Sequence, residues 1–345
     1  MISVAVKTKR IQQHLLMAGE ADQPAMLFIH GNASSAVFWK EMVLKFSATH
    51  FCLAPDLRGY GQTEDLLIHA EQGFGDFVAD LLELLDHFGI EKCTVVGHSL
   101  GGGIIWPLLA SAPQRFVKAI LVNPASPYGF GGTKDEKGTP CFADFAGSGG
   151  GIVNPEFARL IAAQDKSSDN PQASPRVVMN SFYWKPPFVP HWEEELLEGV
   201  LSEKIGPERY PGDFVSSPNY PFVAPGKWGP INASSPKYLD DGVNQFVQKT
   251  THIPILWLRG SDDLIVSDNS LFDFGTLGKL GYVPNYPGEE VYPAQPMLMQ
   301  TRFVLEERKK LGGAYEELVM AGTAHSPFIE QPDLFIAHVR NFLKA

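Results

Sequence analysis

The chain has 345 residues, of which 44% are hydrophobic and 19% charged, a composition typical of a globular protein with one large or two medium-sized domains. Its net charge of −11, without a basic cluster, argues against nucleic acid and anionic membrane surfaces as partners. No apolar run approaches the roughly 18 residues that a membrane span needs. No secretory signal and no metal-ligand spacing are recognisable. With three scattered cysteines, the sequence predicts a cytoplasmic protein without metal or cofactor.

The first 123 residues alternate strand-like and helix-like segments, as in a mostly parallel sheet with helices on both faces. In chain order, strands are expected at 2–8, 10–19, 24–31, 50–56, 92–98 and 117–124, and helices at 34–46, 77–89 and 100–113. The last of these helices contains Pro107, which is expected to act as a kink or early-turn residue.

This alternation stops at residue 124, and the segment 124–251 is rich in Pro, Gly and aromatic residues. A structureless loop of that length is improbable inside a compact domain, so a cap subdomain is predicted at 124–251, with short helices at 154–164 and 193–206. The core domain would then comprise 1–123 and 252–345, with a second irregular insert at 268–295. Its remaining elements are expected to be strands at 253–260 and 315–322 and helices at 296–312 and 331–343.

Glycines crowd around one serine in the stretch CTVVGHSLGGG, residues 93–103. Glycine weakens a strand or helix interior by roughly 0.5–1 kcal/mol relative to alanine, so this cluster suggests a steric requirement. Gly97, Ser99 and Gly101 match the G-x-S-x-G pattern of a nucleophile elbow, in which a strained strand-to-helix turn exposes the serine hydroxyl. The helix that follows would offer free N–H groups to negative charge.

With this motif in its strand–turn–helix setting, the chain resembles the α/β-hydrolases, esterase- or lipase-like serine hydrolases with a large cap. The resemblance covers residues 1–123 and 252–345 and implies a mostly parallel eight-stranded sheet. The stretch FIHGNASS resembles the family's oxyanion loop, which implies that the backbone N–H groups of Asn32 and Leu100 form the oxyanion hole. DLRGYGQT resembles a structural turn in which Asp56 and Arg58 tie loops together.

The family order of the triad is serine, acid, histidine. LRGSDDLIVSD resembles the acid loop and indicates Asp263, with Asp262 as the rival one position away. Some members carry the acid after the preceding strand, where this chain has Asn123, which is no carboxylate. VMAGTAHSPFIEQPDLF resembles the histidine loop and indicates His325 as the general base. His30 is expected to hold the oxyanion loop.

The predicted chemistry is acyl transfer without a cofactor, in which His325 activates Ser99 and Asp263 orients the imidazole. Haloalkane dehalogenases and epoxide hydrolases of this fold use an aspartate nucleophile, so Ser99 argues against both. A carboxylesterase or lipase is favoured, while a lactonase, an amidase, a carbon–carbon bond hydrolase and a perhydrolase remain open. A non-catalytic, hydrolase-like binding protein is the alternative of a different class.

The predicted cap carries more aromatic side chains than a simple cover requires. Most of them are expected to form the cap's own core, and some to face a substrate pocket. The predicted pocket residues are His98, Phe182, Tyr183, Trp184 and Phe188. An acidic chain without an obvious arginine clamp favours a small-molecule ester that is neutral and hydrophobic or aromatic. The sequence indicates neither the substrate itself nor the oligomeric state.

Overall fold

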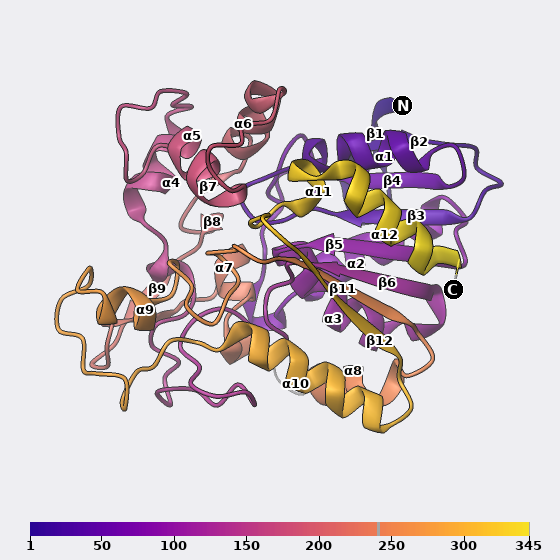
Figure 1. The fold of residues 1–345 in the computed structure, drawn as a ribbon. Helices are drawn as coiled ribbons and strands as arrows, with labels where there is room; N and C mark the ends of the chain where they lie inside the picture. Colours follow the sequence, from indigo (N-terminus) through magenta and orange to yellow (C-terminus); the bar gives the residue numbers. More distant parts are fainter. Residues whose placement is uncertain (240–241, 345) are drawn as a thin grey trace.

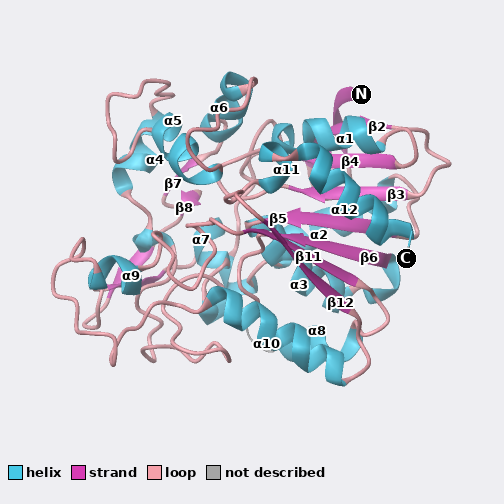
Figure 2. Cartoon of the chain, in the orientation of Figure 1, coloured by secondary structure: helices cyan, strands magenta, loops and turns pink. Residues whose placement is uncertain are grey.

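A computed structural model describes residues 1–239 and 242–344, and its centre is an eight-stranded sheet in the order β1-β2-β4-β3-β5-β6-β11-β12 (Figures 1 and 2). Every neighbouring pair is parallel except β1–β2 and β2–β4, so β2 alone runs against the others. The strands are β1 Ile2–Lys7, β2 Gln12–Ala18, β3 Ala25–Ile29, β4 Phe51–Pro55, β5 Cys93–His98, β6 Phe116–Val122, β11 Ile255–Gly260 and β12 Tyr315–Met320. The predicted mostly parallel α/β sheet is thereby confirmed.

Successive residues of the central strands enter different cores because side chains alternate across a sheet. In β3, Leu27 and Ile29 pack into one hydrophobic core, whereas Met26 and Phe28 pack into the other. Both faces are buried, so the strand is apolar at every position, which is the pattern expected of a parallel sheet covered on both sides. This is why the sequence predicted the strand positions well.

Helices cover both faces of the sheet. The core containing Leu27 includes residues of α2, α3, α8 and α10, and the core containing Phe28 includes residues of α1, α11 and α12. In Figure 1, α12 crosses in front of the strands and α3 lies behind them. The helices are α1 Lys40–Phe46, α2 Gly75–His87, α3 Leu100–Ser111, α8 Gly242–Lys249, α10 Met297–Lys310, α11 Pro327–Glu330 and α12 Pro332–Lys344.

Two expected helices are organised differently from the sequence prediction. The helix expected at 34–46 is divided into a 3₁₀ turn at Ala36–Trp39 and α1. The helix expected at 193–206 ends at Leu201, and Ile205–Gly206 pairs instead as β7 with β8, Tyr210–Pro211. The apolar periodicity ends in LSEKIG, where the chain turns back.

Among the described residues, the segment 124–251 contributes no strand to the main sheet. Besides β7, β8 and α8, it contains α4 Pro155–Ala162, α5 Pro175–Val178, a π-helical turn Met179–Tyr183, α6 Glu193–Leu201, β9 Phe214–Ser216, β10 Val223–Pro225 and α7 Pro230–Ala233. The second irregular segment, 268–295, contains α9 Phe274–Lys279. Figure 1 shows α4, α5, α6 and α9 to the left of the main sheet. We refer to 124–251 and 268–295 as the inserted segments; the status of 124–251 as a cap, and of 268–295 as an insert within the core domain, stays a prediction.

The described residues contain neither a candidate membrane-spanning helix nor a candidate metal-binding cluster. No helix there combines the length and the apolarity that crossing a bilayer requires. No group of three or more His, Cys, Asp or Glu side chains there is arranged to hold a metal ion.

Candidate active site

Ser99 occupies the sharp turn between β5 and α3. Its backbone angles, φ 55° and ψ −119°, lie in a region that residues other than glycine rarely adopt. Such a conformation costs roughly 1–3 kcal/mol and persists only where the surroundings enforce it. The Ser99 N–H donates to the carbonyl of Val122 in β6 at 3.0 Å, and the Ser99 carbonyl accepts from the N–H groups of Gly103 and Ala125. The turn is therefore fixed from both sides.

The glycines around Ser99 make room for other backbone segments. A Cβ atom on Gly97 would lie 2.5 Å from the carbonyl oxygen of Gly101. One on Gly101 would lie 2.4 Å from the carbonyl oxygen of Ile29, at the end of β3. One on Gly102 would lie 2.6 Å from the Cβ atom of Pro124. The cluster thus lets α3 begin directly against the ends of β3 and β6, with Ser99 between them.

The predicted oxyanion donors lie on either side of this turn. Leu100 is the first residue of α3, and Asn32 follows β3 by three residues. Both residues line the cavity described below. Among the described residues, neither backbone N–H has a hydrogen-bond acceptor. Two free amides next to a helix N-terminus can stabilise a developing negative charge.

His30 fixes the loop that carries Asn32. Its Nε2 accepts the N–H of Leu57 at 2.9 Å, which requires the neutral ring to carry its proton on Nδ1. Nδ1 then donates to the carbonyl of Gly31 at 2.8 Å, and Ser34 Oγ donates to the same carbonyl. Burial lowers the pKa of His30, which keeps the ring neutral. These contacts agree with the role that the sequence suggested.

His325 and Asp263 form the buried pair that the histidine and acid loops predicted. His325 Nδ1 lies 2.8 Å from Asp263 Oδ2, and both side chains are 3% exposed. Since a carboxylate only accepts, this contact places the proton of a neutral imidazole on Nδ1 and leaves Nε2 as the basic nitrogen. The rival Asp262 is 41% exposed and pairs with Lys185. The structure therefore places Asp263, and not its neighbour, beside His325.

Asn123 is a site residue that the sequence reasoning missed. It directly follows β6, at the place where some relatives carry the acid, and its Nδ2 donates to Asp263 Oδ2 at 2.6 Å. Asp263 Oδ1 also accepts the backbone N–H groups of Ile265 and Val266. The carboxylate is thus held by donors from two loops before it meets the imidazole. The only sequence signal was the position of Asn123 at a strand end.

His98 and Glu330 support the histidine loop. His98 Nε2 lies 2.7 Å from the carbonyl oxygen of His325, so the ring donates from Nε2, and burial lowers its pKa well below the usual value. Glu330 accepts the backbone N–H of Ala324 at 2.7 Å and that of Lys185, in an inserted segment, at 2.8 Å. Burial raises the pKa of Glu330 to about 7.

Asp56 and Arg58 also tie loops together, as predicted. Asp56 accepts the N–H groups of Ala36 and Gln62, and Arg58 forms a two-pronged ion pair with Asp80 of α2. Neither residue lines the cavity next to Ser99. Their contacts are structural and fix the loop that packs against the oxyanion segment.

Ser99 and His325 line one cavity of about 680 Å³, together with Asn32, Leu100 and His98. Its residues include no Lys, Arg, Asp or Glu. The apolar part of the wall comes mostly from the inserted segments and includes Phe157, Val178, Phe182, Phe272, Phe274 and Leu277. The segment 268–295 therefore contributes to the pocket, which the sequence did not indicate.

Of the four aromatic residues predicted for the pocket, Phe182 and Tyr183 line the cavity, whereas Trp184 and Phe188 lie outside its lining. Trp184 is fully buried and its indole N–H donates to Asn180 Oδ1. Phe188 packs edge-on against Trp184. The π-helical turn Met179–Tyr183 ends between the two groups, and the chain continues from it in extended backbone at Trp184.

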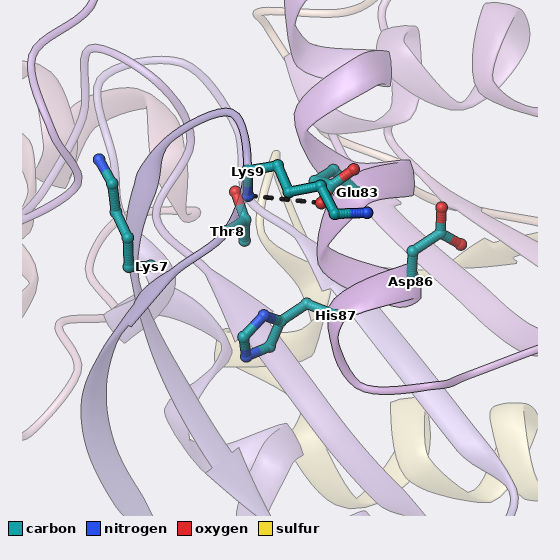
Figure 3. A pocket seen from close by; sticks show the side chains of 6 residues that line it. All are labelled: Lys7, Thr8, Lys9, Glu83, Asp86 and His87. Atoms are coloured by element: carbon teal, nitrogen blue, oxygen red, sulfur yellow. Dashed lines mark hydrogen bonds between the residues drawn. The ribbon is translucent and has the colours of Figure 1, made fainter.

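A second depression shares no lining residue with this cavity. It has a volume of about 280 Å³ and is formed where β1 ends and α2 passes, by Lys7, Thr8, Lys9, Glu83, Asp86 and His87 (Figure 3). The Lys9 N–H donates to Glu83 Oε1 across it at 3.4 Å. None of the predicted site residues lines this depression, so it is not the cavity of the predicted triad.

Comparison with known proteins places this chain in a family. The protein-family model described as the α/β hydrolase fold matches residues 24–285 of this chain. Epoxide hydrolase 4 of Mus musculus is 34% identical over 121 residues, which cover 35% of this chain and 33% of that enzyme. Epoxide hydrolase 3 of Siraitia grosvenorii is 32% identical over 133 residues, 36% of this chain and 42% of that enzyme. The matched stretches thus span less than half of these curated relatives.

Solved structures match over nearly the whole chain. A putative aryl esterase from Burkholderia cenocepacia has a TM-score of 0.62 at 15% identity, covering 99% of this chain and 98% of that one. The hydrolase BphD from Rhodococcus sp. strain RHA1, which acts on 2-hydroxy-6-oxo-6-phenylhexa-2,4-dienoate, has a TM-score of 0.60 at 19% identity, covering 100% and 99%. At these identities the likeness concerns the fold. With the family match over residues 24–285, it shows that the chain belongs to the α/β-hydrolase family.

Proposed function

We propose that this protein is a serine hydrolase that cleaves carboxylic esters of neutral, hydrophobic or aromatic substrates. The observation that carries the proposal is the placement of Ser99. It sits on a strained turn and lines the same cavity as His325, whose Nδ1 is hydrogen-bonded to the buried Asp263. A strained serine that opens onto the same cavity as an oriented imidazole is an arrangement that nucleophilic catalysis can use.

In the proposed reaction, His325 Nε2 takes the proton of Ser99 Oγ as this oxygen attacks the ester carbonyl carbon. The carbonyl oxygen becomes an oxyanion, and the N–H groups of Asn32 and Leu100 stabilise it. Collapse of this intermediate breaks the bond to the alcohol oxygen, which leaves with the proton from His325. Water, deprotonated by His325, then attacks the acyl-enzyme, and the acid is released as Ser99 recovers its proton. Asp263 stabilises the imidazolium in both steps.

The cavity supports the substrate class. It is lined by no charged side chain, so an anionic substrate would lose its hydration without gaining an ion pair. Aromatic and aliphatic residues supply most of its wall, and a volume of about 680 Å³ lies within the range of small-molecule pockets. A bulky acyl or alcohol group fits this environment better than a small polar one.

Epoxide opening is the second candidate, because the curated relatives named above are epoxide hydrolases. Opening an epoxide through an alkyl-enzyme ester requires a carboxylate nucleophile, whereas residue 99 is a serine. Lactone, amide and carbon–carbon bond hydrolysis could use the same three residues. The uncharged lining weighs against carbon–carbon hydrolysis of an anionic substrate.

A substrate panel tests the proposal. The purified protein is assayed with p-nitrophenyl esters of increasing acyl length, phenyl and naphthyl acetates, a lactone, an anilide, styrene oxide and an anionic dienoate. We expect the neutral esters to give the highest kcat/KM, with a preference for bulky groups. Turnover confined to the epoxide or to the anionic substrate would contradict the proposal.

A further inference from the structure

Glu203 is a buried acid that the proposed reaction does not use. It follows α6 in the segment 124–251 and is 4% exposed. Among the described residues, no donor lies at both the distance and the angle of a hydrogen bond to either carboxyl oxygen. It also forms no ion pair with any described residue. An isolated carboxylate is very costly to bury, so this group requires an explanation.

Glu203 lies behind the loop that carries the predicted oxyanion amide. The Tyr60 hydroxyl and the Ala33 N–H face its carboxyl, although neither is aligned for a regular hydrogen bond, and Ala33 is the residue after Asn32. Burial outweighs both and raises the pKa of Glu203 well above its usual value. The adjacent backbone is fixed as well, because the N–H of Lys204 donates to the carbonyl of Gly59 at 2.9 Å.

Tyr60 connects Glu203 with the oxyanion loop. This tyrosine is fully buried, and its hydroxyl donates to Asn32 Oδ1 at 2.8 Å. A phenol has one proton to donate, so once that proton lies on Asn32, the Tyr60 oxygen can only accept. A protonated Glu203 can supply the proton that this oxygen accepts. An ionised Glu203 would compete with Asn32 for the Tyr60 proton.

We propose that Glu203 is a positioning residue for the oxyanion loop, which acts as a neutral acid by donating to Tyr60 and so keeps the Tyr60 proton on Asn32. This role rests on the proposed serine-hydrolase function. The inserted segment thereby holds part of the machinery that receives the oxyanion, besides lining the pocket. A second contact also runs from the inserted segment to this loop: the Tyr183 hydroxyl donates to the Ala33 carbonyl at 3.0 Å.

The other groups around Glu203 do not neutralise a charge on it. Tyr60, Tyr183 and Tyr210 are buried phenols whose pKa values are raised by burial and by Glu203. The Lys204 amine is directed instead to the carbonyl oxygen of Gly61, at 3.4 Å. A negative Glu203 would therefore lie uncompensated near the site where the oxyanion develops, which would disfavour the transition state.

Two substitutions at Glu203 separate hydrogen bonding from packing. Glu203→Gln keeps the shape and a donor for Tyr60, and we expect kcat within about threefold of wild type. Glu203→Met keeps the volume but removes the donor. We expect it to lower kcat about 10- to 100-fold with KM changed less than threefold, somewhat below the cost of deleting an oxyanion-hole donor.

Tyr60→Phe completes a double-mutant cycle in which the second substitution adds little to the first, because both break one chain of hydrogen bonds. The affinity of a trifluoromethyl ketone, which forms a tetrahedral oxyanion on the nucleophile, should fall in parallel with kcat. If Glu203→Met keeps wild-type kcat, if Glu203→Gln loses as much as Glu203→Met, or if the two sites act additively, the positioning role is overturned.

Thermal unfolding of the Glu203→Gln protein tests the neutral state without any substrate. The raised pKa means that the folded protein binds this proton more tightly than the unfolded chain, so wild type loses stability as pH rises above about 4.3, the usual glutamic acid value. The Glu203→Gln protein should therefore gain Tm over wild type at pH 8 but not at pH 4. Equal differences at both pH values would contradict the neutral acid. Absence of any ester hydrolysis by wild type would overturn the proposed function. The Tm comparison involves no substrate, so its failure would overturn only the neutral state of Glu203.

Discussion

The sheet region and the inserted segments of this protein supply different things to one cavity. The sheet places Ser99, Asp263 and His325 just after β5, β11 and β12, at the carboxyl ends of parallel strands where open α/β folds collect their functional groups. The inserted segments supply most of the apolar wall. Under the proposed function, the sheet determines the reaction type and the inserted segments determine selectivity. Glu203 is the proposed exception, because it acts on the sheet's oxyanion loop from the insertion.

The largest effect is expected at the nucleophile, on the sheet side of this comparison. Ser99→Ala removes the attacking oxygen and should lower kcat by roughly 10⁵–10⁶-fold, as loss of the nucleophile does in serine proteases. Steady-state kinetics with a p-nitrophenyl ester measure it. Ser111→Ala, at the far end of α3 and outside the cavity, is the matched control. Residual activity of Ser99→Ala near the wild-type level would mean that the chemistry lies elsewhere.

The next prediction distinguishes the roles of two adjacent aspartates, Asp263 and Asp262, by their effect on kcat. Asp263→Asn exchanges the acceptor of His325 Nδ1–H for an amide and should lower kcat by about 10³–10⁴-fold, as in the serine-protease template. Asp262→Asn weakens exposed contacts with Lys185 and Ser261, neither of which lines the cavity, and should change kcat less than threefold. Both proteins are compared with the same ester at equal folded fraction by circular dichroism. The reverse ranking would contradict the observed pairing.

The inserted side of the comparison is tested by two phenylalanines. Phe182 lines the cavity, whereas Phe188 packs outside it. Phe182→Ala should change the preference between long and short acyl esters by roughly 1–3 kcal/mol while small activated esters are still hydrolysed. Phe188→Ala should leave the preference unchanged. Loss of turnover on every ester in folded Phe182→Ala would mean that the insertion holds a reacting group.

The smallest effect concerns the second donor to Asp263. Asn123→Ala removes the Nδ2–H donor and should lower kcat roughly 10-fold, in the range of hydrogen bonds to charged groups. Asn123 has a φ of 42°, so the substitution also strains the backbone. Asn123→Gly relieves that strain and should be as slow as Asn123→Ala in kcat. If Asn123→Gly recovers wild-type kcat, the backbone and not the hydrogen bond mattered.

The two regions also differ in how far the sequence predicted them. β3 is apolar at every position and β5 is buried at every position, because helices cover both faces of the sheet. These strands and the loops after them could therefore be located from local sequence pattern. Ser99, Asp263 and His325 followed from motifs in those loops. Their roles in catalysis stay predictions, whereas the pairing of Asp263 with His325 is observed.

What the sequence could not give depends on contacts between distant residues. Asn123 meets Asp263 across 140 positions, and Glu203 reaches the oxyanion loop only because the chain turns back after α6. The expected helix at 193–206 would have made Glu203 an ordinary helical carboxylate. In the same way, Phe182 and Trp184 stand two positions apart in an aromatic stretch, yet Phe182 lines the cavity and Trp184 does not.

The most direct measurement of the central claim is covalent labelling. The wild-type protein is treated with a fluorophosphonate, digested, and the modified residue identified by mass spectrometry. The account predicts one phosphonyl group on Ser99, with loss of ester hydrolysis in proportion to labelling and no labelling of Ser99→Ala. A label on another residue, or full ester hydrolysis by protein labelled on Ser99, would contradict it.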